Sequence, residues 1–155
     1  FGRIARETAK LAKAIGMNVI YNTRSGRKEG CDEFEFVPME ELLAKSDFIS
    51  LHIPYDKEQR ALIGPKEFEK MKEGVFIVNC ARGGIIDETA LLAALDSGKV
   101  AAAALDVYEQ EPTRNERLYT HSKICLTPHI GASTIEAQER IGKEVIEIIK
   151  NRRLL

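Results

Sequence analysis

Four polar residues that could carry chemistry follow apolar runs of the chain. Arg82 comes after "VFIVNC", Asp106 and Glu111 come after "AAAAL", and His129 comes after "KICL". If these runs are parallel strands, their carboxyl ends meet at one edge of a sheet, where proteins of this class bind ligands. The pattern therefore predicts that an arginine, two carboxylates and a histidine converge on one site.

These residue types suit the transfer of a hydride to a 2-keto acid. The alkoxide that forms needs a proton, and a histidine titrates in the right range to supply it. A carboxylate beside the imidazole favours the charged form and fixes the tautomer. An arginine holds a substrate carboxylate in two places and polarises the ketone next to it. A carboxylate at Asp106 would accept a hydrogen bond from a nicotinamide carboxamide.

Each of these residues also has an ordinary structural explanation. Arg82 could pair with a surface acid, Glu111 could be a solvated turn residue, and the backbone could satisfy His129 at the edge of the core. Convergence at the ends of successive strands favours a functional site over these separate explanations.

The elements that would position these residues alternate between strand-like and helix-like patterns. Strands are expected at 17–21, 34–37, 47–54, 75–80, 99–107 and 123–128, and helices at 3–15, 38–45, 65–72, 88–98 and from 135 onwards. The run at 75–80 lacks alternation, which predicts a strand buried on both faces. The run at 99–107 contains four alanines that favour helix, but its place between a helix and a turn favours a strand. Such alternation predicts a parallel sheet with helices on both faces.

Two helices carry apolar residues on one face. Ile4, Leu11 and Ile15 share a face of the first helix. After Thr134, which is expected to cap the last helix, the apolar stripe consists of Ile141, Val145, Ile148 and Ile149.

Composition describes an ordinary globular chain the size of one domain. The 155 residues are 44% hydrophobic and carry a formal net charge of −1, which gives no reason to expect nucleic acid or membrane partners. The spacing of Cys31, Cys80 and Cys125 matches neither a zinc site nor a disulfide framework. Cys80 and Cys125 lie in apolar runs, so we expect small buried side chains in a reducing cytoplasm, and no metal.

The longer motifs resemble those of a known family. "FGRIA", "LHIP", "NCARGGIIDETALLAAL", "AALDVYEQEP" and "LTPHIGAST" are similar to successive motifs of the D-isomer-specific 2-hydroxyacid dehydrogenases. The resemblance covers essentially the whole chain, but only the cofactor-binding domain of that family. It implies a doubly wound Rossmann-type α/β fold, NAD or NADP as cofactor, a small 2-hydroxyacid or 2-keto acid as substrate, and a homo-oligomer.

The resemblance also implies roles for individual residues. Arg82 matches the arginine that binds the substrate carboxylate, Glu111 the glutamate that pairs with the histidine, and His129 the acid–base. Asp106 matches the nicotinamide-binding aspartate. The other implied cofactor contacts are Gly2, Arg3, Ile4, Asn22, Arg24, His52, Pro54, Cys80, Ala81, Arg82, His129 and Gly131, with the pyrophosphate at the helix start formed by Arg3 and Ile4.

Two positions depart from the family pattern. NAD-dependent members usually have an aspartate at the end of the second strand, where it binds the ribose hydroxyl. Here Asn22 stands in that place, and Arg24, Ser25, Arg27 and Lys28 follow it. This loop is either a site for the 2′-phosphate of NADP(H) or a solvated basic loop. The second departure is the sequence Pro54-Tyr55-Asp56, where members often have Pro-Leu-Thr.

The substrate and the role of the chain have competing interpretations. "TPHIGASTIEAQERIG" is most similar to the D-3-phosphoglycerate dehydrogenases, which open the serine pathway, and the alternative is a glyoxylate or hydroxypyruvate reductase. A dinucleotide-binding module for sensing and an inert fragment are further alternatives. Arg82, Glu111 and His129 together favour an enzyme, because sensing needs no proton donor.

The chain opens within the glycine fingerprint G-x-G-x-x-(G/A), of which "GRIA" is the second half. This predicts that residues 1–155 are a truncated cofactor domain of a longer enzyme. The central first strand of the order 3-2-1-4-5-6 and the substrate domain would then be missing. We accordingly expect self-association that fills the gap, no activity of the chain alone, and weak cofactor binding at best.

Overall fold

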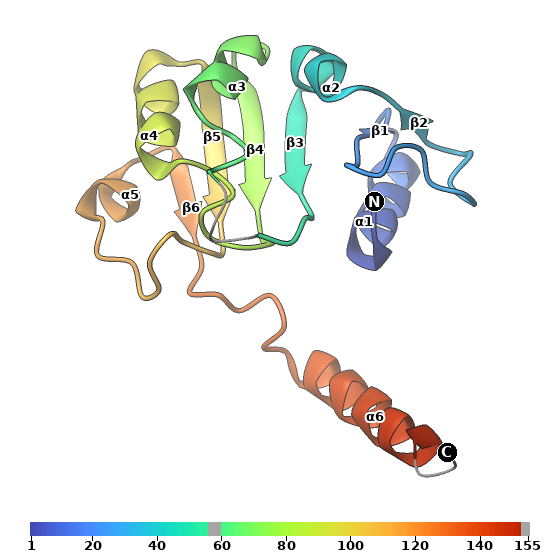
Figure 1. The fold of residues 1–155 in the computed structure, drawn as a ribbon. Helices are drawn as coiled ribbons and strands as arrows, with labels where there is room; N and C mark the ends of the chain where they lie inside the picture. Colours follow the sequence, from blue (N-terminus) through green and yellow to red (C-terminus); the bar gives the residue numbers. More distant parts are fainter. Residues whose placement is uncertain (56–59, 153–155) are drawn as a thin grey trace.

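The structure, a computed structural model, describes residues 1–55 and 60–152, in which helices and strands alternate along the chain (Figure 1). The strands are β1 (Ile20–Tyr21), β2 (Glu35–Phe36), β3 (Phe48–Leu51), β4 (Val75–Asn79), β5 (Val100–Leu105) and β6 (Ile124–Leu126). The helices are α1 (Arg3–Ala14), α2 (Met39–Lys45), α3 (Pro65–Lys70), α4 (Glu88–Ser97), α5 (Glu116–Thr120) and α6 (Ile135–Arg152). All predicted elements are present. Helix α5 was not predicted, because one short turn shows no hydrophobic period.

The strands form two parallel sheets. Four strands pair in the order β3-β4-β5-β6, and β1 pairs only with β2. Figure 1 shows the β1–β2 pair beside β3, and in the described part of the chain no strand joins the two. This arrangement confirms the predicted Rossmann-like parallel sheet with helices. Within the described ranges the predicted helix layer is not found on the face of the four-stranded sheet that carries Phe76.

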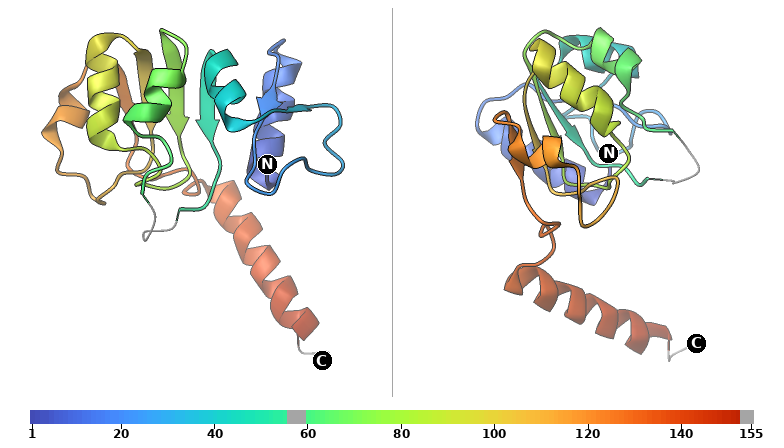
Figure 2. Two further views of the ribbon diagram at one scale, coloured as in Figure 1. Left: turned by 45° about the horizontal axis from the view of Figure 1, so that its top comes forward. Right: turned by 90° about the vertical axis from the view of Figure 1, so that its left-hand side faces the viewer.

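The main core lies between the four-stranded sheet and the helices α3 and α4, which share one face of it (Figure 2). Helix α4 begins where the Asp87 carboxylate accepts a hydrogen bond from the Ala90 N–H at 2.9 Å. It ends at Gly98, whose φ of 83° is the left-handed conformation that glycine tolerates best. Leu91 and Leu95 of α4 are fully buried in this core.

A second, smaller core joins α1 to the β1–β2 pair. It consists of Ala9, Tyr21, Cys31 and Phe34, with the ring of Phe1 stacked on Tyr21 at 4.1 Å between centroids. The helix packs through its small residues Ala5 and Ala9. Its predicted apolar face is exposed instead, at Ile4, Leu11 and Ile15.

The prediction that 75–80 is buried on both faces was wrong. Phe76 is 39% exposed and stacks on the exposed Phe48 at 4.7 Å, because no described helix covers that face of β4. Cys80 and Cys125 are also exposed rather than buried. Cys80 lies past the last residue of β4, and Cys125 points to the uncovered face of the sheet. Cys31 is buried.

Helix α6 extends away from both sheets after the loop that follows β6 (Figures 1 and 2). The side-chain oxygen of Thr134 accepts a hydrogen bond from the Ala137 N–H, which confirms the predicted cap. The predicted stripe of Ile141, Val145, Ile148 and Ile149 is exposed along its length. None of the helices in the described ranges is both long and apolar enough to cross a membrane.

Candidate active site

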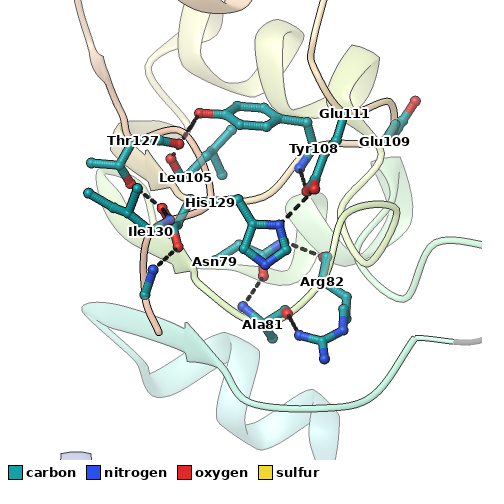
Figure 3. Close-up of polar contacts among 12 residues, drawn as sticks. Asn79, Ala81, Arg82, Leu105, Tyr108, Glu109, Glu111, Thr127, His129 and Ile130 are labelled. Carbon is teal, nitrogen blue, oxygen red and sulfur yellow. Dashed lines mark hydrogen bonds and ion pairs between the residues drawn. The ribbon is translucent and has the colours of Figure 1, made fainter. Parts of the chain in front are cut away.

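The loops that follow β4, β5 and β6 form the candidate site (Figure 3). The last residue of β5 pairs with the last residues of both β4 and β6, so the three carboxyl ends lie level at one edge of the sheet. Arg82 lies on the first loop, Glu111 on the second and His129 on the third. The structure therefore brings the three candidate catalytic residues to one edge.

His129 and Glu111 form the central contact of the site. The imidazole Nδ1 lies 2.7 Å from the carboxylate Oε2 of Glu111, and Oε1 accepts a hydrogen bond from the Tyr108 N–H at 3.2 Å. The bond with His129 lowers the pKa of Glu111; burial opposes this shift, and the bond from Tyr108 adds to it. An ionised carboxylate only accepts hydrogen bonds, so Nδ1 carries a proton. Nε2 is left to exchange a proton with a ligand.

The backbone at His129 directs the imidazole into the site. Its φ of 55° is the one positive value at a non-glycine residue in the described ranges, and it costs on the order of 1 kcal/mol. The buried carboxylate of Asp106 holds the loop in this conformation. It accepts hydrogen bonds from the Thr127 hydroxyl and from the N–H groups of Ile130 and Gly131, at 2.8 and 2.9 Å for the last two.

These contacts give Asp106 a structural role. Burial raises its pKa, but the hydrogen bonds from Thr127, Ile130 and Gly131 outweigh burial and hold the pKa below its ordinary value. Both carboxylate oxygens accept bonds from the loop that carries His129. Its contact with nicotinamide stays a prediction.

The loop that carries Arg82 is shaped by a buried amide. Asn79, 2% exposed, accepts a hydrogen bond from the Ala81 N–H at 3.1 Å and donates one to the Arg82 carbonyl at 2.9 Å. The exposed guanidinium donates from Nη1 to the Ala81 carbonyl at 2.6 Å. Its other donors have no partner within the described ranges, so they are available to an anionic ligand.

The start of α1 lies near the end of β3. Burial lowers the pKa of His52, and the positive charge of the amino terminus lowers it further. The Nε2 atom of His52 lies 2.9 Å from the Ser50 hydroxyl. The first N–H groups of a helix have no intrahelical partner, and here they belong to Arg3 and Ile4. A Cβ on Gly2 would meet nothing within 4 Å, so the helix start is open. The Arg3 side chain pairs with Glu144 of α6 at 3.3 Å.

The loop after β1 is folded onto itself. Asn22 donates from its amide to the Val37 carbonyl at 2.8 Å, which ties this residue to the end of β2. Arg27 pairs with Asp32 at 3.0 Å. Arg24 also has a contact within the chain. The loop therefore belongs to the β1–β2 pair, whereas His129 follows β6 of the other sheet.

The candidate contacts Pro54 and Cys80 lie on the loops that follow β3 and β4. Pro54 precedes Tyr55, whose ring lies where a Cβ on Gly84 would come within 2.5 Å. Asp56 lies outside the described residues. Partial burial raises the pKa of the Cys80 thiol, and the nearby carboxylate of Asp106 adds to this shift.

Sequence reasoning missed three residues that support the site. Asn79 could have been found, because it is a polar residue at the last position of an apolar run. Thr127 and Tyr108 carried no such signal. The Tyr108 hydroxyl donates to the Thr127 carbonyl at 2.7 Å, a contact between two loops that appears only in the folded chain.

Comparison with known proteins identifies the family. Residues 1–131 match the model described as "D-isomer specific 2-hydroxyacid dehydrogenase, NAD binding domain". The chain is 50% identical over 151 residues to 4-methyl-2-oxopentanoate reductase A of Aspergillus oryzae, covering 97% of this chain and 46% of that protein. It is 48% identical over 153 residues to the D-3-phosphoglycerate dehydrogenase of Archaeoglobus fulgidus, covering 97% and 29%. A solved glyoxylate reductase from Paecilomyes thermophila has a TM-score of 0.88 at 44% identity, covering 95% of this chain and 45% of that chain.

The chain thus spans less than half the length of each of these proteins. The family match runs from Phe1 to Gly131, and so includes the strand-end loops that carry Arg82, Glu111 and His129. The chain belongs to the D-isomer-specific 2-hydroxyacid dehydrogenases, and its residues 1–131 correspond to their NAD-binding domain.

Proposed function

We propose that the chain supplies the cofactor-binding half and the acid–base pair of an enzyme that transfers a hydride between a nicotinamide cofactor and a D-2-hydroxyacid. The 2.7 Å contact between His129 Nδ1 and Glu111 Oε2 carries this proposal. A module that only bound a dinucleotide would need no histidine paired with a carboxylate at the sheet edge. Arg82 adds the planar donor group that binds carboxylates.

The chain's own residues would act on the proton and on the substrate carboxylate. Bound nicotinamide supplies the hydride for reduction and accepts it in oxidation. During reduction, Nε2 of the His129 imidazolium gives its proton to the substrate oxygen, and in oxidation it takes the proton back. Glu111 stabilises the imidazolium and keeps the ring oriented through Nδ1. Arg82 holds the substrate carboxylate.

The residues at the start of α1 fit a dinucleotide. The open N–H groups of Arg3 and Ile4 suit a pyrophosphate, because a helix N-terminus attracts anions. The space beside Gly2 allows the phosphates to approach the backbone. The site would take NAD or NADP. Neutral Asn22 with the basic Arg24 on the same loop supports NADP, whereas the Arg27–Asp32 pair removes one cation from that role.

Within this proposal the first choice of substrate is 3-phosphoglycerate, which would place the enzyme in serine biosynthesis. The run "TPHIGASTIEAQERIG" and the similarity to an archaeal D-3-phosphoglycerate dehydrogenase support this choice. The alternative is a glyoxylate or hydroxypyruvate reductase, which the similarity to the solved glyoxylate reductase supports.

A substrate panel on the full-length enzyme tests the proposal. 3-Phosphoglycerate, glycerate, glycolate and lactate are each offered with NAD and with NADP, and 4-methyl-2-oxopentanoate with both reduced cofactors. Activity with 3-phosphoglycerate alone would support the first choice. Activity with glycolate or glycerate would support the alternative, and no activity with any pair would contradict the proposed reaction.

A further inference from the structure

We propose that Glu88 and Glu109 form a clamp that positions the Arg82 loop against the Glu111 loop. Glu88 is the first residue of α4, where the Arg82 loop ends. Glu109 lies on the loop after β5, two residues before Glu111. The catalytic meaning of this clamp rests on the proposed function. The clamp itself is a property of the folded chain.

The clamp consists of two reciprocal hydrogen bonds. Oε1 of Glu88 accepts from the Glu109 N–H at 2.8 Å, and Oε1 of Glu109 accepts from the Glu88 N–H at 2.9 Å. The Asn115 amide donates to the second oxygen of Glu88 at 3.4 Å. Each loop therefore binds the backbone of the other, and neither can shift without breaking both bonds.

Capping of α4 does not explain Glu88. Asp87 already caps this helix through the Ala90 N–H. Glu88 is only 8% exposed, and burial raises the pKa of its carboxyl. The bond from the Glu109 N–H opposes that shift, and the Glu109 carboxylate adds to it. A buried carboxylate next to another acid costs stability. We therefore assign Glu88 the role of fixing the position of the loop.

A close backbone contact lies next to the clamp. A Cβ on Gly83 would lie 1.6 Å from the Tyr108 carbonyl oxygen, so the loop that carries Arg82 rests directly on Tyr108. The Tyr108 N–H in turn binds Glu111. Opening the clamp would separate Gly83 from Tyr108 and loosen the hold of Tyr108 on Glu111. Contact between Glu111 and His129 would weaken with it.

Nuclear magnetic resonance on this chain tests the clamp without any catalytic assay. The Glu111 carboxyl is titrated through its side-chain carbon in the wild type and in the variants Glu88→Ala, Glu88→Gln and Asp87→Ala. We expect Glu88→Ala to raise the Glu111 pKa toward its ordinary value of about 4.3, because the bonds from His129 and the Tyr108 N–H that lower this pKa weaken when the clamp opens. Glu88→Gln keeps an accepting oxygen and should retain the wild-type value. Asp87→Ala weakens the same helix end without touching the Glu111 loop, and should also retain it.

An unchanged Glu111 titration in folded Glu88→Ala would overturn the proposal, as would an equal rise in Asp87→Ala. If Glu88→Ala does not fold, Glu109→Ala decides in the same way, because Glu109 is exposed and its loss removes the other half of the clamp. In the full-length enzyme, we expect Glu88→Ala to lower kcat by about tenfold to 100-fold with little change in the KM for cofactor. An inactive wild-type enzyme, together with the expected titration shift in Glu88→Ala, would contradict the proposed function but still support the clamp.

Discussion

The four-stranded sheet and the α1–β1–β2 region differ in how much they bury. Among the residues that the structure describes, the first contains a core cluster of 19, and its strand-end loops are held by Asn79, Asp106 and the Glu88–Glu109 clamp. The core cluster of the second has only four members among the described residues, and the apolar face of its helix is exposed. The candidate acid–base pair thus lies on the well-packed region, while the predicted adenosine contacts lie on the sparsely packed one. Chemistry and cofactor choice should therefore respond to different mutations.

The largest expected effect is on turnover of the full-length enzyme. We expect His129→Gln to lower turnover by about 10²–10⁴, because it removes the proton donor, and to leave cofactor affinity nearly intact. Steady-state kinetics and calorimetric titration with NADH measure the two quantities. His121→Gln is the matched control, since that histidine pairs with Asp96 away from the site. Equal losses of turnover in the two variants would remove His129 from its proposed role.

The second largest expected effect is on stability, where core mutations should affect the two regions differently. Leu95→Ala empties a fully buried position of the large core, and we expect a loss of about 2–5 kcal/mol in the free energy of unfolding. Phe34→Ala should instead open the small core locally. Hydrogen exchange would then speed up at the Val37 amide, which bonds to Tyr21, and remain slow in β4 and β5. If Phe34→Ala exposes β4 and β5 equally, the two regions unfold as one unit.

Cofactor choice should follow the residue at the end of β1. We expect Asn22→Asp to shift the ratio of NADH to NADPH affinity toward NADH by about tenfold, because a carboxylate binds the ribose hydroxyls and repels a 2′-phosphate. Calorimetry on the full-length enzyme measures both affinities. Asn22→Ala loses the same bond to Val37 without adding charge, and it is the control. A ratio equal in the two variants would exclude the loop after β1 from cofactor choice.

The smallest expected effect is on stability at acid pH. The folded pKa of Glu111 lies below the unfolded value of about 4.3, so its contribution is complete above that pH. It is lost as the pH falls through the folded pKa. Because Glu111 is partly exposed, we expect less than about 1 kcal/mol. Urea unfolding at pH 7 and pH 3 should show a smaller acid-induced loss in Glu111→Gln than in the wild type. Equal losses would mean that the pair with His129 contributes nothing to folding.

Local chemistry in the sequence accounts for much of the fold. Asp87 caps the start of α4 and Gly98 ends it, as their residue types predict. The alanine-rich run of β5 forms a strand, as its place between a helix and a turn predicts. Arg82, Glu111 and His129 could be named because each follows a strand, and parallel strands end at a common edge.

The features that sequence reasoning missed depend on distant partners. Phe76 and Cys125 are exposed because one face of the sheet is uncovered, and Cys80 is exposed because it lies past the end of β4. An apolar run in the sequence shows only that burial is favourable. The Glu88–Glu109 clamp joins residues 21 positions apart, and acidic residues are ordinarily assigned to solvent. Such pairings become visible only when the loops are placed side by side.

We expect the unpaired edges of β1 and β3 to make the association state of this chain depend on its concentration. Within the described ranges, neither edge is paired with another strand, so backbone donors and acceptors remain open on both. We expect a second copy to occupy them, and association then adds a free energy that grows with the logarithm of concentration. The melting temperature should rise on concentrating the chain, and sedimentation should show larger species. A monomer whose melting temperature is the same at every concentration would mean that the edges are closed in another way. If the chain associates in this way, its stability values are comparable only at one stated concentration.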